Sequence, residues 1–347
     1  MGDSKACAHV DVGPFAPSRA DGAGRFAPSH PTGAGRFAPS RADGAGRFAP
    51  SPTSDLHLGN LRTALLAWLW ARTENRPFLL RVEDLDQQRV AAAPQVAARQ
   101  LDDLRTLGID WDGEVLRQSE RLELYRQAAA GLETYECFCT RREIAEASQA
   151  PNGGPGAPQY RPYPGTCAHL SSAERDQRRR ARQPAIRVRA EGSVFSIHDA
   201  HAGEVTGLVD DFVLFRADGT PAYNLAVVVD DGLTGVTQVV RADDLLDSSP
   251  RQGWLASRLG FTVPGYVHVS LALNPAGQRL AKRDGAVTLT DLARGGRTPA
   301  DVLHLICDSA GMPRADSATR VLSALEAGRG DLANPLVWKP WVVAGAA

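Results

Sequence analysis

Residues 57–60, with the sequence His-Leu-Gly-Asn, combine residue types that suit the binding of a phosphate or another anion. The apolar residues after them recur at helical spacing, so they are expected at the N-terminus of a helix over 58–74. Unpaired N–H groups and the positive dipole end of a helix favour an anion there. Gly59 leaves room for a phosphate at the backbone, and His57 can donate a hydrogen bond to charge developing on a phosphate oxygen. These features predict a nucleotide site, and an ordinary surface histidine is the alternative.

A second basic segment, residues 279–285, has the sequence Arg-Leu-Ala-Lys-Arg-Asp-Gly and lies between two glycines, Gly277 and Gly285. Its composition is that of a mobile loop. Phosphoryl transfer depends mainly on positioning the reactants and stabilising charge on phosphate oxygens. Lys282 is therefore a candidate partner for the phosphates that leave when a nucleotide reacts at residues 57–60.

Four polar residues that are far apart in the sequence suit a pocket for an amino acid. Arg47, Glu83, Tyr223 and Arg241 each lie at or near the end of an expected strand. Ligands of doubly wound α/β sheets bind beyond the carboxyl ends of the strands. Two guanidinium groups and an acid match an amino acid with two carboxylates and an ammonium group. The alternative is a set of surface ion pairs around residues 81–86.

Together, residues 57–60 and 279–285 resemble the HIGH and KMSKS signatures of class I aminoacyl-tRNA synthetases. Residues 47–51, 81–84 and 282–285 are similar to the glutamyl branch of that family. The resemblance implies ATP with Mg²⁺ as a substrate and His57 and Lys282 as catalytic groups. The glutamate-binding residues that it implies are Arg47, Phe48, Ala49, Pro50, Ser51, Glu83, Tyr223 and Arg241. The ATP-binding residues that it implies are His57, Gly59, Asn60 and Lys282.

Three cysteines, Cys137, Cys139 and Cys167, are candidates for a structural zinc site, which takes four ligands. Ligand chemistry alone favours His169 as the fourth ligand. The resemblance to glutamyl-queuosine tRNA(Asp) synthetases implies Tyr163 instead, because Tyr-x₃-Cys follows Cys-x-Cys in that family. Cysteines that are buried as small apolar groups are the alternative to a metal site.

The resemblance also bears on the nucleic-acid partner. Residues 286–347 leave no room for the long helical part with which full-length glutamyl-tRNA synthetases read an anticodon. The truncated relatives activate glutamate without tRNA and transfer it to queuosine in the anticodon of tRNA(Asp), and this implies the same reaction here. Arg279 and Ala281 replace the usual lysine and serine, so a degenerate paralogue that binds nucleotide or RNA is one alternative. A glutamyl-tRNA synthetase without its own anticodon domain is another.

Apolar residues at strand spacing and at helical spacing predict the elements that position these groups. The β-α-β unit 46–50, 58–74 and 77–82 implies a parallel sheet. A further apolar run at 225–229 precedes two aspartates. The other expected strands are 185–189, 194–197, 204–208, 211–216 and 236–241. The other expected helices are 94–107, 120–134, one from about residue 242, 251–259, 299–310 and 316–327. The predicted fold is α/β: a doubly wound parallel-sheet, Rossmann-like nucleotide-binding core with a small zinc-binding insertion and a short helical end.

The 347 residues are enough for two compact units, and their net charge of −1 argues against a uniformly basic nucleic-acid binder. Arginines at 175–182 predict a solvated helix face, with contact to an RNA backbone as the alternative. The sequence has no apolar segment long enough for a membrane span or a signal peptide, which predicts a cytoplasmic protein without a membrane partner. The protein is expected to be a monomer. The expected organisation is disordered 11-residue repeats at 1–45, a first catalytic half at 46–134, a zinc-binding insertion at 135–190, a second catalytic half at 191–295 and a helical end at 296–347.

Overall fold

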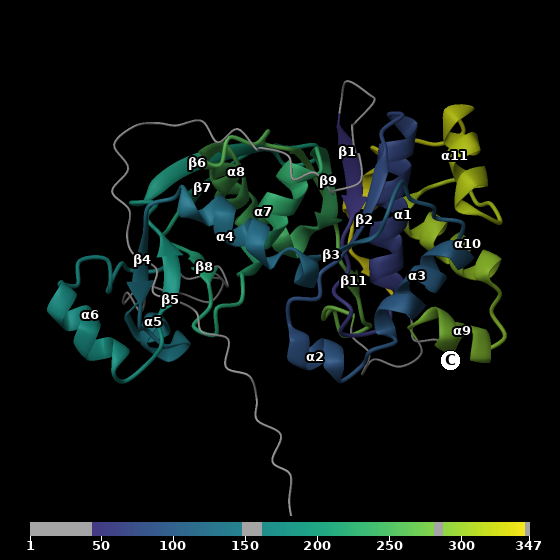
Figure 1. Cartoon of the computed structure of the whole chain (residues 1–347). Coiled ribbons are helices and arrows are strands. Elements are labelled where there is room, and N and C mark those ends of the chain that lie inside the picture. The colour runs from purple at the N-terminus through teal and green to yellow at the C-terminus, as the bar shows by residue number, and fades with distance from the viewer. Residues whose placement is uncertain (1–43, 148–161, 281–286, 344–347) are drawn as a thin grey trace, which may run out of the picture.

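The computed structural model describes residues 44–147, 162–280 and 287–343. The repeats predicted at 1–45 lie outside these residues except for 44 and 45. Ala281 and Lys282 also lie outside them. The described part is built on a seven-stranded sheet with helices on both faces (Figure 1). Its strands run in the order β3-β2-β1-β9-β10-β6-β7, and every neighbouring pair is parallel except β6 with β7. In that order their bounds are Leu116–Arg117, Phe78–Val82, Ala45–Phe48, Val236–Ala242, Gly265–Val269, Ser193–Asp199 and Gly203–Val209.

The strand order reverses beside β1, because β2 lies on one side of it and β9 on the other. The two β-strands 45–48 and 78–82 and the helix between them form the predicted β-α-β unit. A crevice opens beyond the carboxyl ends of the strands at such a reversal. The α/β prediction of a doubly wound, largely parallel sheet is confirmed.

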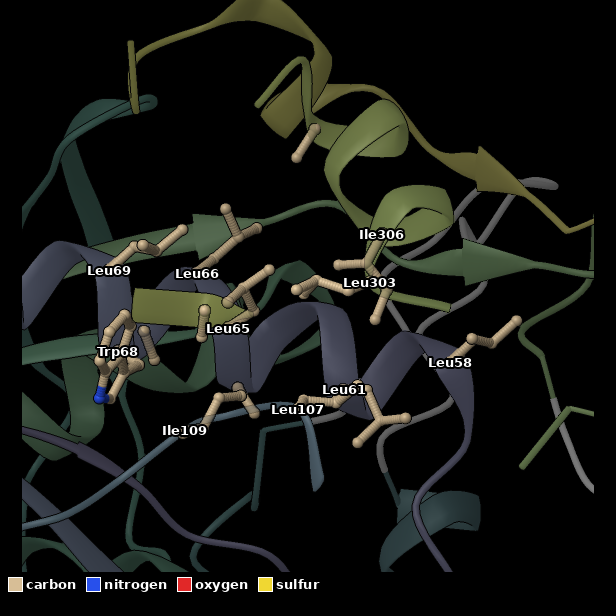
Figure 2. Close-up of a cluster of buried hydrophobic side chains, with 14 of the residues drawn as sticks. Leu58, Leu61, Leu65, Leu66, Trp68, Leu69, Leu107, Ile109, Leu303 and Ile306 are labelled. Atoms are coloured by element: carbon tan, nitrogen blue, oxygen red, sulfur yellow. The ribbon is translucent and has the colours of Figure 1, made fainter. Parts of the chain in front are cut away.

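Helix α1 (Leu58–Thr73) covers one face of the sheet. It is apolar on several sides because it is enclosed by the sheet, by α3 (Val96–Thr106) and by α10 (Pro299–Ala310) and α11 (Ala318–Glu326). Figure 2 shows its side chains packed against those of α10 and of the segment after α3. The members of this cluster that it labels are Leu58, Leu61, Leu65, Leu66, Trp68, Leu69, Leu107, Ile109, Leu303 and Ile306.

Helices on the side of the sheet away from α1 carry a second apolar cluster, and Figure 1 shows where these helices lie. This cluster joins α4 (Leu122–Ala130), α7 (Tyr223–Leu233) and α8 (Ser249–Arg258). The apolar run 225–229 is the buried middle of α7 and not a strand. A short run of consecutive apolar residues shows neither helical nor strand periodicity, so a buried helix and a buried strand cannot be distinguished from it. As a result Tyr223 begins a helix, and its expected place near a strand end is wrong.

A small antiparallel sheet lies apart from the main sheet, at the left of Figure 1. Its strands are β4 (Thr134–Cys137), β5 (Ala185–Val188) and β8 (Val213–Phe215), in that order. Helices α5 (Arg141–Ala147) and α6 (Ser172–Arg179) flank it. Strand β8 comes after residue 190, where the insertion was expected to end, yet it pairs with β5. Within this unit Arg187 is buried, and its guanidinium lies 3.6 Å from the centre of the Tyr163 ring.

Shorter elements complete the described chain. The helix expected from residue 242 is a 3₁₀ helix, Asp243–Ser248, and α8 follows it directly. Strands β11 (Ala272–Leu273) and β12 (Trp341–Val342) pair in parallel, so the C-terminal part is not wholly helical. The remaining short helices are α2 (Gln87–Ala91), 118–120, α9 (Leu289–Arg294) and 335–338. None of the described helices has the length and apolarity that crossing a membrane requires.

Arg62 on α1 ties the C-terminal part to the core, although it is 1% exposed. Its guanidinium donates to the carbonyl oxygens of Ser270 (2.8 Å), Leu336 (3.1 Å) and Val337 (3.1 Å). Its Nε donates to Oγ of Ser309 at 3.0 Å. Burying a cation is costly unless its donors are satisfied, so these four acceptors make the C-terminal segment a structural partner of α1.

Candidate active site

One cavity of about 80 Å³ lies where the sheet reverses. The carboxyl ends of β1, β2 and β9 bring Arg47, Glu83 and Arg241 to its wall, and the start of α7 adds Tyr223. Phe48 and Ala49 also line it, together with Thr63, Val240 and Leu245. The four residues singled out in the sequence therefore share one site, although up to 194 positions separate them in the chain.

Pro50 and Ser51 follow β1 and do not line this cavity. The carbonyl of Pro50 accepts a hydrogen bond from the backbone N–H of Glu83 at 3.0 Å. The carbonyl of Ser51 accepts one from the Gln100 side chain at 3.0 Å. These bonds fix the turn between β1 and α1, so Pro50 and Ser51 shape the site through the backbone.

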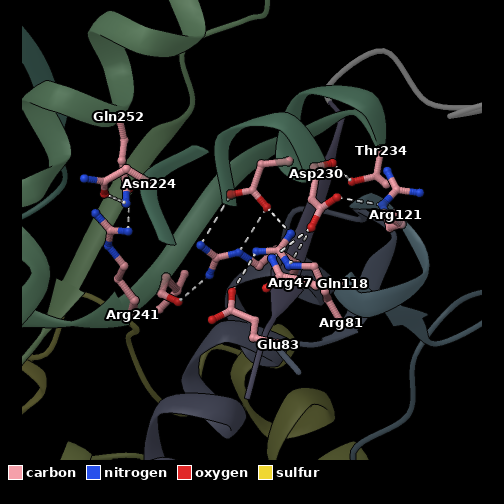
Figure 3. A network of polar contacts seen from close by, with 12 residues as sticks. Arg47, Arg81, Glu83, Gln118, Arg121, Asn224, Asp230, Thr234, Arg241 and Gln252 are labelled. Atoms are coloured by element: carbon pink, nitrogen blue, oxygen red, sulfur yellow. Dashed lines mark hydrogen bonds and ion pairs between the residues drawn. The ribbon is translucent and has the colours of Figure 1, made fainter. Parts of the chain in front are cut away.

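Arg47 and Glu83, which line the cavity, belong to a network of charged groups most of which are buried (Figure 3). The carboxylate of Asp231 is shared by Arg81 at 2.5 Å and Arg47 at 3.5 Å. Arg81 also reaches Glu83 at 3.2 Å. Burial opposes charge on Asp231, but the guanidinium groups of Arg81 and Arg47 outweigh it and lower the pKa of Asp231. Burial raises the pKa of Glu83, although Arg81 and Arg47 oppose this. The alternative of surface ion pairs around residues 81–86 is wrong for Arg81, which is 3% exposed.

The adjacent Asp230 is completely buried, and it shares Arg81 (3.7 Å) with Asp231 but has further partners of its own. It accepts hydrogen bonds from the side chains of Gln118 (2.9 Å), Arg121 (2.6 Å) and Tyr125 (2.9 Å). Sequence reasoning assigned no role to either aspartate. The available signal was two acids that directly follow an apolar run, since acids that are buried need cationic partners.

Arg241 is a buried side chain with several protein partners. Its Nε donates to Nε2 of His268 at 3.0 Å, and its Nη1 donates to Oε1 of Gln252 at 2.7 Å. Its Nη2 donates to Oγ of Ser249 at 2.8 Å. These partners could not be predicted from the sequence, because they come from β10 and α8, which follow Arg241 in the chain.

His57 is the N-cap of α1 and forms a reciprocal pair with Asn60. Its Nδ1 accepts from the backbone N–H of Asn60 at 3.2 Å, and its own N–H donates to Oδ1 of Asn60 at 3.2 Å. Burial, with the nearby charge of Arg279, lowers the pKa of His57 to about 4. The ring is therefore neutral near pH 7, and because Nδ1 accepts, its proton is on Nε2. His57 can thus both cap the helix and donate a hydrogen bond from Nε2.

Gly59 has a structural role that the sequence did not reveal. A Cβ at this position would lie 2.9 Å from Cβ of Ala272 and 3.0 Å from Cε1 of His57. Contacts this short require something to move. Glycine at position 59 is therefore needed for the approach of α1 to β11, whatever ligand is present.

The described residues on both sides of 281–286 lie against the start of α1 or beside β11. Leu280 donates its N–H to the carbonyl of Ala272 at 2.9 Å, and the N–H of Leu58 donates to the carbonyl of Val287 at 2.9 Å. Arg279 forms an ion pair with Asp244, in the 3₁₀ helix after β9. The start of α1 thus contacts residue 287, which closely follows the segment 279–285, although Lys282 itself lies outside the described residues.

The three cysteines of the small unit lie together. The Sγ atoms of Cys137, Cys139 and Cys167 are all within 4.8 Å of one another, so they could hold a metal ion. The hydroxyl of Tyr163 lies 3.4 Å from Sγ of Cys137 and 3.7 Å from Sγ of Cys139. His169 is exposed and does not belong to this cluster.

Comparison with known proteins gives a consistent result. The family model for the catalytic domain of class I tRNA synthetases (E and Q) matches residues 45–329. The chain is 58% identical over 262 residues to a glutamyl-Q tRNA(Asp) synthetase from Cutibacterium acnes, covering 76% of this chain and 74% of that protein. It is 59% identical over 268 residues to one from Nocardia farcinica, covering 76% and 83%.

Among solved structures, a glutamate tRNA ligase from Elizabethkingia meningosepticum in complex with its amino acid is similar, with a TM-score of 0.69 and 25% identity. The match covers 87% of this chain and 67% of that one. The residues that the family model matches include those of the sheet, the cavity and the start of α1. The chain therefore belongs to the class I tRNA synthetases of the E and Q family and is a ligase.

Proposed function

We propose that this protein activates L-glutamate with ATP in the absence of tRNA, and then transfers glutamate to queuosine in the anticodon of tRNA(Asp). The observation that carries the activation step is the convergence of Arg47, Glu83 and Arg241 with Tyr223 on one cavity. Two guanidinium groups and one carboxylate complement the charges of glutamate. The acceptor is proposed from the relatives that carry the name glutamyl-Q tRNA(Asp) synthetase. We place the reaction in the cytoplasm.

In the proposed first step, an oxygen of the glutamate α-carboxylate attacks the α-phosphorus of ATP in line. A carboxylate–phosphorus bond forms, the bond to pyrophosphate breaks, and pyrophosphate leaves with Mg²⁺. Arg47 and Arg241 hold the carboxylates, and Glu83 holds the ammonium group. Nε2–H of His57 donates to the α-phosphate, and Gly59 and Asn60 fix the start of α1 beside it. Lys282 stabilises the leaving phosphates.

The test of this function has two parts. Exchange of pyrophosphate into ATP is expected with glutamate alone and without any tRNA. Labelled glutamate is then expected to attach to tRNA from cells that make queuosine and not to tRNA from cells that cannot. Absence of exchange under all conditions would contradict the activation step. Equal labelling of both tRNA pools would contradict the acceptor and favour charging of another tRNA.

We also propose that Cys137, Cys139, Tyr163 and Cys167 hold one structural Zn²⁺. In a tetrahedral site with Zn–S distances of about 2.3 Å, sulfur atoms lie about 3.8 Å apart, and a sulfur and an oxygen lie about 3.5 Å apart. Sγ of Cys139 lies 3.6 Å from Sγ of Cys167, and the hydroxyl of Tyr163 lies 3.4 Å from Sγ of Cys137. The donor set fits the ion in both chemistry and spacing.

Substituting Cys139 by serine is expected to remove most of the bound zinc and to lower the midpoint of thermal unfolding, because the ion links segments on both sides of residues 148–161. Metal analysis of the purified protein is expected to give about one zinc per chain, and this zinc content should not change in Cys307→Ser, a control at a buried cysteine that belongs to the main apolar cluster and not to the zinc site. His169→Ala is expected to keep its zinc and Tyr163→Phe to lose affinity. If His169→Ala lost its zinc and Tyr163→Phe kept it, the fourth ligand would be His169 and not Tyr163.

A further inference from the structure

The guanidinium of Arg241 is oriented by protein groups on several sides. Besides His268, Gln252 and Ser249, its Nη2 donates to the carbonyl of Leu245 at 3.3 Å. These bonds use four of the five N–H groups that an arginine has. Within the described residues, one N–H of Nη1 has no partner, so it can meet a ligand in the cavity that Arg241 lines. The direction of that N–H depends on how the protein holds the other four.

The bond from Nε of Arg241 determines the protonation of His268. A guanidinium can only donate, so Nε2 of His268 must accept, and the ring proton of the neutral imidazole is on Nδ1. Nδ1 lies 2.8 Å from Oδ2 of Asp199 and donates to it. The His268 side chain is 2% exposed and that of Asp199 is 1% exposed, so water does not compete for these bonds.

Asp199 is itself fixed by the backbone. Its Oδ1 accepts from the N–H groups of His201 (2.9 Å) and Ala202 (2.8 Å), in the turn between β6 and β7. Its Oδ2 also accepts from the N–H of His268 at 3.0 Å. The carboxylate therefore has four donors and one orientation. A chain of hydrogen bonds thus runs from the β6–β7 turn through His268 on β10 to Arg241 on β9.

We propose that Asp199 and His268 are positioning residues of the glutamate site, which act through Arg241. Asp199 selects the Nδ1–H tautomer of His268, and His268 then presents the acceptor that orients the guanidinium. The inference rests on the proposed role of Arg241 in binding glutamate. An imidazole with its proton on Nε2 would turn an N–H towards Nε–H of Arg241, and the guanidinium would have to rotate away.

Two substitutions at one position separate this role from packing. In His268→Asn, the amide can still reach Asp199, but no acceptor reaches Arg241. In His268→Gln, the longer amide places its oxygen near the position of Nε2. We expect His268→Asn to raise the KM for glutamate about tenfold or more, with the KM for ATP unchanged and kcat changed much less. We expect His268→Gln to stay within about threefold of the wild type, and Asp199→Asn to change in the same direction as His268→Asn.

The measurement is glutamate-dependent exchange of pyrophosphate into ATP by the full chain, normalised to the active fraction from an adenylate burst. A merely structural role would reduce that fraction and the midpoint of thermal unfolding but leave the KM of the active molecules unchanged. A folded His268→Asn variant with the wild-type KM overturns the inference, as does a His268→Gln variant that is equally impaired. Arg241→Ala separates the two proposals. If its KM for glutamate is unchanged, the proposed glutamate site is wrong. If its KM for glutamate rises but that of the His268 variants does not, this inference alone fails.

Discussion

Asparagine in place of His57 is expected to lower kcat for adenylate formation about 10²–10³-fold, the usual effect of removing one donor that stabilises charge in a transition state. Asn Oδ1 can replace Nδ1 as the acceptor for the N–H of Asn60, and asparagine is a good N-cap. It has no counterpart of Nε2–H. The substitution therefore removes the proposed contact with the α-phosphate and leaves the start of α1 in place. The measurement is single-turnover formation of glutamyl-adenylate.

His57→Ala serves as the comparison, because it removes both the donor and the cap. It is expected to match the loss of kcat in His57→Asn and to cost about 1 kcal/mol more in unfolding free energy. If His57→Asn keeps kcat within a few fold while His57→Ala is destabilised, His57 is a helix cap and not a catalytic group.

The lowered pKa of His57 has a consequence for stability with a definite sign. In the unfolded chain the imidazole takes up a proton near pH 6.5, whereas in the folded protein it does so only near pH 4. The unfolded state therefore binds more protons between these values, and the contribution of His57 is complete above pH 6.5 and is lost as the pH falls towards 4. The wild type is therefore expected to lose stability relative to His57→Asn from pH 7 to pH 5, measured as the free energy of unfolding in urea.

Asp231→Ala is expected to be among the most destabilising single changes in the described part of the chain, by about 3–5 kcal/mol. The buried guanidinium of Arg47 would lose the carboxylate with which it pairs, whereas Arg81 would keep Glu83 and Asp230 as partners. Breaking a buried ion pair from one side leaves an uncompensated charge, which costs much more than a surface pair contributes. Unfolding by urea, monitored by tryptophan fluorescence, measures the loss.

The same substitution at Asp316 is the matched control. Asp316 pairs with Arg320 at 3.1 Å, but its side chain is 65% exposed. Asp316→Ala is expected to change the unfolding free energy by less than about 1 kcal/mol. An Asp231→Ala variant as stable as Asp316→Ala would show that the buried network contributes little to the fold.

Much of the fold could be predicted from the sequence because its helices and strands follow the local periodicity of apolar residues. The helix predicted at 299–310 has those bounds, and the elements of the unit 46–82 differ from their prediction by at most two residues at any end. Pro299 after the cap residue Thr298 marks that helix start clearly. The run 225–229 carried no such signal, so the helix that places Tyr223 and both buried aspartates was missed.

In the candidate site, only the residues that line the cavity could be predicted from the sequence. Arg47, Glu83 and Arg241 stand at strand ends, and the sheet must bring such ends to one edge. The groups behind them, such as Asp231 and His268, are defined by which side chains meet across the fold. No spacing rule encodes that choice, because the partners come from elements that are distant in the chain and are selected by packing.

Arg62 also constrains when the enzyme can become complete. It is translated early, yet two of the carbonyl oxygens that satisfy its guanidinium follow 274 and 275 positions later. Until those residues leave the ribosome, two of the acceptors that satisfy Arg62 in the folded protein are missing, and forming so distant a contact is slow. We therefore expect premature termination near residue 330 to leave a chain with most of its sheet sequence that chaperones and proteases still treat as unfinished.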